Sequence, residues 1–327
     1  MRGDQLLRFL AQRLLKLVLL TFALVVVNFM LIHAAPGDPA SVMAGQSGAA
    51  DERYLAQLRE QFGLDRPLAE QLWIYVSRVA TLDLGISHRM QRPVADLILE
   101  RLPATLLLSV TAFAFAVAAG IAMGAAAARR AGTVWDSLIT ALSMVFYCTP
   151  LFWTGLLLVL LFSVTLNWLP SFGMSTVGAD YTGLRAALDV AEHLVLPALT
   201  LGLFYLAVYA RLTRSSVLEV AGQDFVKTAR AKGVGEGRIL RRHVLRNALL
   251  PVITIAGIVF STMLGANVLV EKVFSWPGVA SYALDALQAS DYAPVQGFVL
   301  LMASIFVVVN LLIDILYGIA DPRAVAE

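Results

Sequence analysis

The chain has 327 residues, of which 59% are hydrophobic and 15% are charged, with a mean hydropathy of +0.75 and a net charge of +2. Soluble domains carry about 25% charged residues. Here whole blocks lack charge, so the composition argues against a soluble protein and predicts several membrane spans. The small net charge does not suggest a nucleic-acid-binding protein. The single cysteine, Cys148, excludes an intrachain disulfide bond and a multi-cysteine metal site.

Six apolar segments predict an all-α, polytopic membrane protein. The apolar core of the first exceeds the roughly 7–15 residues of a signal peptide, which favours an uncleaved span over a cleaved signal. Gly120 and Gly124 form a GxxxG pattern in the second, which fits packing inside the bundle and a subunit interface equally well. Pro150 lies inside the third and is expected to kink it, because proline removes a backbone hydrogen bond. The predicted spans are residues 14–32, 102–128, 138–165, 193–212, 251–270 and 297–316.

The distribution of basic residues predicts which side each loop faces. Sixteen lysines and arginines fall on the side that holds both termini, whereas the two short outer loops hold only Arg185 and Lys272. The seven in the long segment after the first span weigh little, because long segments follow charge weakly. Short cytosolic loops carry the excess of basic residues, so both termini are expected in the cytosol.

Residues 33–101 form the longest polar segment. Apolar residues at helical spacing predict short amphipathic helices at residues 51–62 and 67–80, the second with Pro67 in its first turn. We expect these helices to cover the outer mouth of the bundle. The predicted division is an N-terminal span with its outer segment, residues 1–101, and a core of five spans, residues 102–327.

The basic loop at residues 212–250 lies between the fourth and fifth spans. It holds eight basic and three acidic residues, a net charge of +5, and should face the cytosol. Residues 219–232 are expected to extend the fourth span as a helix that ends at Gly233 and leaves Phe225, Val226 and Ala229 available to a partner. The alternative is a basic loop that only fixes the topology, and charge alone does not separate the two.

The sequence predicts no catalytic site. It lacks the GxxxxGK[ST] phosphate loop and the HExxH zinc motif, and its four histidines have no ligand-like spacing. It also lacks the intramembrane ionisable pairs and the internal repeat expected of a secondary transporter, which is the remote alternative. The chain is therefore interpreted as a non-enzymatic pore subunit with no metal or cofactor of its own.

Several segments of the chain form an ordered set of motifs. Residues 223–233, QDFVKTARAKG, are followed by Arg242-His243 and by RNALLP at 246–251; further segments are 36–39, 62–67, 98–105, 169–173, 271–278 and 291–297. This set resembles the permease subunits of bacterial ATP-binding-cassette (ABC) importers of the dipeptide, oligopeptide and nickel branch, whose EAA loop the first segment matches. Lys227-Thr228-Ala229 stands where the general pattern has Glu-Ala-Ala, so no role of that glutamate carries over.

The resemblance implies a type I ABC importer permease fold in the bacterial cytoplasmic membrane. It implies a second, similar permease, two ABC ATPases that bind ATP and Mg²⁺, and an extracytoplasmic substrate-binding protein. Peptides are the implied cargo, with nickel chelates and glutathione-like peptides as alternatives. Polar residues of the fifth span, Ser261, Thr262 and Asn267, are candidates to line the pore, although such residues also join helices to one another. The residues implied to couple to an ATPase are Gly222, Gln223, Asp224, Phe225, Val226, Lys227, Thr228, Ala229, Arg230, Ala231, Lys232 and Gly233.

Overall fold

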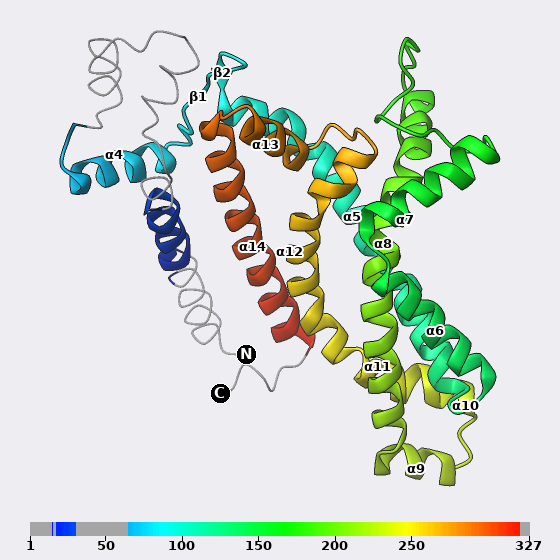
Figure 1. Cartoon of the computed structure of the whole chain (residues 1–327). Coiled ribbons are helices and arrows are strands. Elements are labelled where there is room, and N and C mark those ends of the chain that lie inside the picture. The colour runs from blue at the N-terminus through cyan, green and yellow to red at the C-terminus, as the bar shows by residue number, and fades with distance from the viewer. Residues whose placement is uncertain (1–14, 16–17, 31–64, 321–327) are drawn as a thin grey trace. The chain divides into compact units, whose positions relative to one another are not determined.

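The computed structural model describes residue 15, residues 18–30 and residues 65–320, with side chains up to residue 311. These residues form helices and one antiparallel pair of two-residue strands (Figure 1). The all-α prediction is confirmed. After an apolar helix at Val18–Met30, the elements are α4 Leu68–Ala80, β1 Ile86–Ser87, β2 Arg92–Pro93, α5 Val94–Arg129, α6 Val134–Cys148, α7 Leu151–Leu158, the π-helical segment η1 Val159–Thr165, α8 Leu184–Ala221, α9 Asp224–Ala231, α10 Glu236–Arg238, the π-helical segment η2 Ile239–Val244, α11 Leu245–Ala248, α12 Leu250–Val273, α13 Val279–Gln288 and α14 Tyr292–Ala320.

Four helices in the described part of the chain are long and apolar enough to cross a membrane, and a bent pair of helices counts as a fifth if the two form one span. The four are Val94–Arg129, Gly183–Ala221, Leu250–Val273 and Tyr292–Leu311. The first predicted span is seen as the shorter apolar helix Val18–Met30, and the rest of it lies outside the described residues. Large apolar side chains are exposed along these helices, as expected where helices face lipid rather than water.

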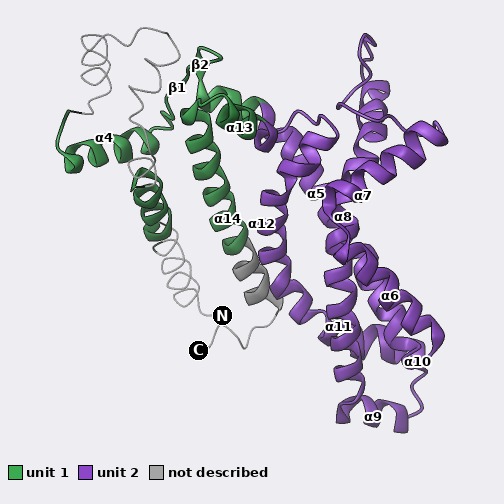
Figure 2. Cartoon of the chain, in the orientation of Figure 1, with its two compact units in different colours: residues 1–100, 282–311 green, residues 101–281, 312–327 purple. Residues whose placement is uncertain are grey.

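The chain divides into two compact units (Figure 2). One comprises residues 1–100 and 282–311, and the other comprises residues 101–281 and 312–327. The N-terminal unit thus also contains residues 282–311, which the sequence had assigned to the core. The second unit contains the basic loop and is the one that carries the candidate site.

The third predicted span consists of two helices rather than one kinked helix. Val134–Cys148 and Leu151–Thr165 are bent by 105° relative to each other. Thr149 adopts an extended backbone, which a following proline favours, and Pro150 precedes the first residue of α7. Proline therefore ends one helix and starts another, so the position of the bend was predicted and its size was not.

Several other predicted boundaries differ from the structure. α5 begins at Val94 instead of residue 102, α8 begins at Leu184 instead of residue 193, and α13 lies inside the predicted loop 271–296. Hydropathy changes where the chain leaves the apolar layer, whereas a helix continues until its backbone hydrogen bonds are broken. The amphipathic helix predicted at residues 67–80 is confirmed as α4, and the one at 51–62 lies outside the described residues.

α8 forms the centre of the second unit. In its most apolar 18-residue window 72% is buried, compared with 22–33% in the other three long spans. α5 approaches it closely, because a Cβ at Gly120 would overlap that of Tyr209 and one at Gly124 would overlap the carbonyl oxygen of Ala210. The GxxxG pattern therefore packs within the chain, which decides between the two alternatives.

A buried carboxylate joins α5, α12 and α13. Glu271, expected in a loop, lies in the last turn of α12 and has no exposed surface. Its Oε1 accepts a hydrogen bond of 2.8 Å from the Thr105 hydroxyl, and its Oε2 accepts one of 2.7 Å from the backbone N–H of Ser281. Ser281 lies in the first turn of α13, where the helix dipole favours a negative charge. A Cβ at Gly278 would overlap this carboxylate, so the close approach requires glycine.

Candidate functional site

The basic loop contains a short helix, α9, that follows α8 directly (Figure 1). α8 ends at Ala221, and the extended backbone of Gln223 turns the chain before α9 begins at Asp224. Asp224 lies in the first turn of α9, at the positive end of the helix dipole. The predicted helix at residues 219–232 is interrupted at Gly222-Gln223, where glycine allows the chain to turn.

One face of α9 packs against its own chain. Val226 has no exposed surface and Ala229 has 8%. Both belong to a cluster of buried apolar residues that we call the loop cluster, defined by the residues given at the end of this paragraph. The expectation that Val226 and Ala229 are available to a partner is wrong, because α8 and the returning chain cover them. The loop cluster consists of Ala128, Val217, Val220, Val226, Ala229, Ile239, Val244 and Ala248.

The other face of α9 is open. Phe225 is 41% exposed, and Thr228 and Lys232 are exposed as well. The Lys227 ammonium contacts the Asp224 carboxylate at 2.8 Å, although both side chains remain mostly exposed. This face therefore presents an apolar ring among charged groups.

Gly233 ends α9. Its φ of +77° lies in the left-handed region, where residues other than glycine are strained. Its N–H donates to the Arg230 carbonyl at 2.9 Å, and the N–H of Val234 donates to the Ala229 carbonyl at 3.2 Å, as in a glycine-terminated helix. The chain then continues through α10 and η2 to α11.

An exposed ion pair spans this turn. Arg230 donates to both oxygens of Glu236, at 2.7 and 3.2 Å. These hydrogen bonds hold the pKa of the Glu236 carboxyl below its usual range and raise the pKa of Arg230. The pair is solvated, so it orients the turn more than it stabilises the fold.

The returning segment, η2 and α11, presents exposed basic residues. Ile239, Val244 and Ala248 enter the loop cluster. Arg241, Arg242 and Arg246 remain exposed, so this segment is amphipathic with a positive outer face. η2, α11 and α9 therefore pack together, so the basic loop is folded rather than extended.

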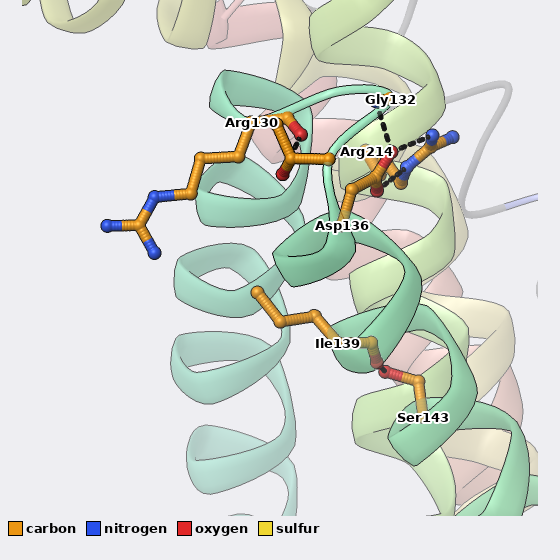
Figure 3. Close-up of polar contacts among 7 residues, drawn as sticks. Arg130, Gly132, Asp136, Ile139, Ser143 and Arg214 are labelled. Carbon is orange, nitrogen blue, oxygen red and sulfur yellow. Dashed lines mark hydrogen bonds and ion pairs between the residues drawn. The ribbon is translucent and has the colours of Figure 1, made fainter.

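A third ion pair joins Arg214, at the start of the basic loop, to α6, and it was not predicted from the sequence (Figure 3). The carboxylate of Asp136, in the first turn of α6, accepts hydrogen bonds of 2.7 Å from Nε and 2.7 Å from Nη2 of Arg214 on α8. It also accepts one of 3.0 Å from the N–H of Gly132 in the connection from α5. Asp136 is 5% exposed. The signal in the sequence was an acid and a base just outside two predicted spans; Arg214 was counted only as a marker of topology, and Asp136 was not considered.

Of the three polar residues of the fifth span, Asn267 joins two helices. Asn267 has no exposed surface, and its amide donates to the Ser109 hydroxyl on α5 at 2.6 Å. Thr262 donates to the Val259 carbonyl of its own helix at 2.9 Å, and Ser261 is half-buried. In this conformation Asn267 has no surface for a solute to contact, so the alternative role in joining helices fits it better.

The described residues contain no group of three or more His, Cys, Asp or Glu side chains placed to hold a metal ion. The site consists of an exposed short helix, an apolar cluster beneath it, and three ion pairs. The outer face of α9 is a surface that can bind another molecule, and its inner face connects α9 to α8.

Comparison with known proteins identifies the family. Residues 116–325 match the family described as the binding-protein-dependent transport system inner membrane component, and residues 6–109 match the N-terminal membrane component of the same transport systems. The chain is 42% identical over 335 residues to the dipeptide transport system permease protein DppB of Escherichia coli K12, covering 97% of this chain and 98% of that protein. It is 40% identical over 333 residues to the di/tripeptide permease DppB of Pseudomonas aeruginosa, with the same coverage. It is 40% identical over 316 residues to the glutathione transport system permease GsiC of Escherichia coli O6:H1, again covering 97% and 98%.

The fold agrees with this relationship. An inward-facing structure of the MetNI methionine ABC transporter aligns with a TM-score of 0.55 and 18% identity, covering 72% of this chain and 100% of that one. At this identity the match concerns the fold alone, and it confirms the ABC importer permease fold expected from the sequence. The chain belongs to the family of inner-membrane permease components of binding-protein-dependent transport systems.

Proposed function

We propose that this chain is the permease subunit of an ABC importer that passes peptides across the bacterial cytoplasmic membrane, with both termini and the basic loop in the cytosol. It pairs with a second, similar permease, receives its solute from an external binding protein, and is driven by two ATPase subunits that bind ATP and Mg²⁺. The peptide cargo is supported by the dipeptide and di/tripeptide permeases that it resembles over nearly its full length.

The observation that carries this proposal is the two-sided character of α9. Its inner face is fixed to α8 through the loop cluster, and its outer face presents Phe225 between charged groups. An eight-residue helix is not stable alone in water, so packing on α8 keeps it formed. A partner that displaces α9 therefore displaces the end of α8 as well.

The mechanism that follows is rigid-body coupling. Closure of the ATPases around ATP moves α9, and Val217 and Val220 pass this movement to α8, the most buried span of the second unit. Because packed helices move between discrete arrangements, the spans alternate between inward and outward access. This chain supplies the pore and the helices that transmit the movement, α9 and α8, and ATP hydrolysis by its partners supplies the free energy.

Two glycines in the loop provide a matched test. Gly233 has a φ of +77° and Gly235 a φ of −63°, and a Cβ at either meets nothing within 4 Å. Gly233→Val should therefore disturb the end of α9 through the backbone alone, and Gly235→Val should not. In proteoliposomes with the assembled transporter, Gly233→Val is expected to abolish uptake of radiolabelled dialanine at unchanged complex yield. Normal uptake and normal substrate-stimulated ATP hydrolysis in Gly233→Val would refute the role of α9.

Glutathione import is the second candidate, because the glutathione permease is about as similar as the peptide permeases. Competition of dialanine uptake by glutathione separates the two, and a labelled nickel chelate tests the remaining alternative. Uptake by the purified chain without ATPase subunits would instead indicate a secondary transporter.

A further inference from the structure

The Asp136–Arg214 ion pair has a more defined geometry than two charges need if they only set which side of the membrane a loop faces. Both carboxylate oxygens are engaged by the guanidinium fork, and one of them also accepts the N–H of Gly132. A bidentate pair forms in one relative position of its two helices, whereas a single charge contact tolerates several. In this packing the Asp136 side chain is 7% exposed and that of Arg214 is 33% exposed, so the carboxylate relies on the guanidinium rather than on solvent for its hydrogen bonds.

Two other contacts between α6 and α8 are less directional. Tyr147 of α6 stacks on Phe204 of α8 with 5.2 Å between ring centroids and 19° between planes. The guanidinium of Arg211 lies 5.3 Å from the centre of the Tyr147 ring. Ring faces can slide across one another at little cost, as in the shear motions of packed helices. The ion pair is the directional contact of this interface.

Arg214 also lies close to the attachment of α9. Val217 and Val220 follow it on α8, within two turns, and both are buried in the loop cluster with Val226 of α9. The last turns of α8 therefore hold α9 through apolar contacts and α6 through the ion pair. A displacement of α9 therefore pulls on α8 through the apolar contacts and on α6 through the ion pair.

We infer that Asp136 and Arg214 are positioning residues that fix the register of α6 on α8, so that both helices move as one body when α9 is displaced. This inference rests on the proposed function and adds a route for the movement, from α9 through α8 into α6. The alternative is a pair that only neutralises two charges near the membrane surface, with no part in the movement.

The double variant D136N/R214Q separates these roles. It removes both charges together, so no unpaired charge is left buried and the usual reason for misfolding is absent. Its amides cannot reproduce the bidentate fork. Arg214→Lys keeps the positive charge but cannot make the bidentate contact with Asp136. It provides the same test if the double variant does not assemble. The matched control is R66Q/E70Q, which removes an exposed ion pair of 2.8 Å between Arg66, just before α4, and Glu70 in its first turn.

The measurement is a spin-label distance between α6 and α8 in the assembled transporter in lipid nanodiscs. The background is Cys148→Ser, since Cys148 is the only cysteine, and the labels are attached at Met144→Cys and Leu218→Cys, both exposed. The distance is recorded without nucleotide and after trapping with ATP and vanadate, so no knowledge of the cargo is required.

With the pair intact, and in the control, we expect the same distance in both states. In D136N/R214Q, or in Arg214→Lys, trapping should shift the distance, by up to about 5.4 Å for a slip of one helical turn. A distance that changes on trapping in the unsubstituted pair, or an unchanged distance in these variants, would overturn the inference. Uptake by the Gly233→Val transporter tests the proposed function separately. If Gly233→Val abolishes uptake and the distance in D136N/R214Q does not change on trapping, the proposed function stands and this inference is refuted.

Discussion

The attachment of α9 to α8 can be tested by removing two methyl groups. Val226 has no exposed surface and lies in the loop cluster, so Val226→Ala loses about 0.8 kcal/mol for each buried methyl group and a further term for the cavity. The total is about 2 kcal/mol, which corresponds to a roughly 30-fold increase in the population of detached α9. Because α9 is too short to persist alone, detachment exposes its backbone amides.

Hydrogen exchange of the α9 amides, followed by mass spectrometry on the assembled transporter, measures this population. Val226→Ala should accelerate exchange by about 30-fold, and substrate-stimulated ATP hydrolysis should fall in proportion to the detached fraction. The matched control is the neighbouring Phe225→Ala, whose side chain is 41% exposed. It should change exchange less than about threefold, as surface substitutions do, while still weakening the contact with the ATPase. Faster exchange in Phe225→Ala than in Val226→Ala would refute the assignment of the two faces.

Three further predictions follow from the packing of the second unit. Gly124→Ala places a Cβ against the carbonyl oxygen of Ala210 and should destabilise the fold by about 1–3 kcal/mol, seen as a lower thermal midpoint in detergent, whereas Gly265→Ala, where a Cβ meets nothing within 4 Å, should leave the midpoint unchanged. Gly278→Ala should reduce the yield of folded protein because its Cβ overlaps the Glu271 carboxylate; the loss in G278A/E271A should be smaller than the sum of the single losses, and strict additivity would show that the two do not clash. Asn267→Ala should lower the thermal midpoint through the lost bond to Ser109 and leave the KM for dipeptide uptake unchanged, while a changed KM at an unchanged midpoint would place Asn267 in the solute path.

The sequence predicted the positions of the spans well, because an uncharged run long enough to cross a bilayer is rare outside membrane-spanning helices. It located their ends poorly. α8 extends from Leu184 to Ala221, well beyond the apolar residues 193–212, because charged side chains at its ends do not break its hydrogen bonds. The bend at Pro150 was predicted, but its angle of 105° depends on the packing of α6 and α7.

In the candidate site, too, the sequence predicted local helices but not the contacts between segments far apart in the chain. The sequence predicted Phe225, Val226 and Ala229 together as a surface for a partner, whereas Val226 and Ala229 lie on a buried face and Phe225 is exposed. What covers that face could not be read from periodicity, because α8 and η2 come to it from elsewhere in the chain. The Asp136–Arg214 pair joins residues 78 positions apart, and no local pattern relates them.

The proposed function depends above all on contact between the outer face of α9 and an ATPase. Photo-cross-linking from a benzophenone side chain placed at Phe225 in the assembled transporter measures this contact directly, with the same group at Phe172, which is 57% exposed in the predicted outer loop, as the control. We expect Phe225 to cross-link to an ATPase subunit and Phe172 not to do so. A cross-link from Phe172 to an ATPase, or from Phe225 only to the external binding protein, would contradict the proposal.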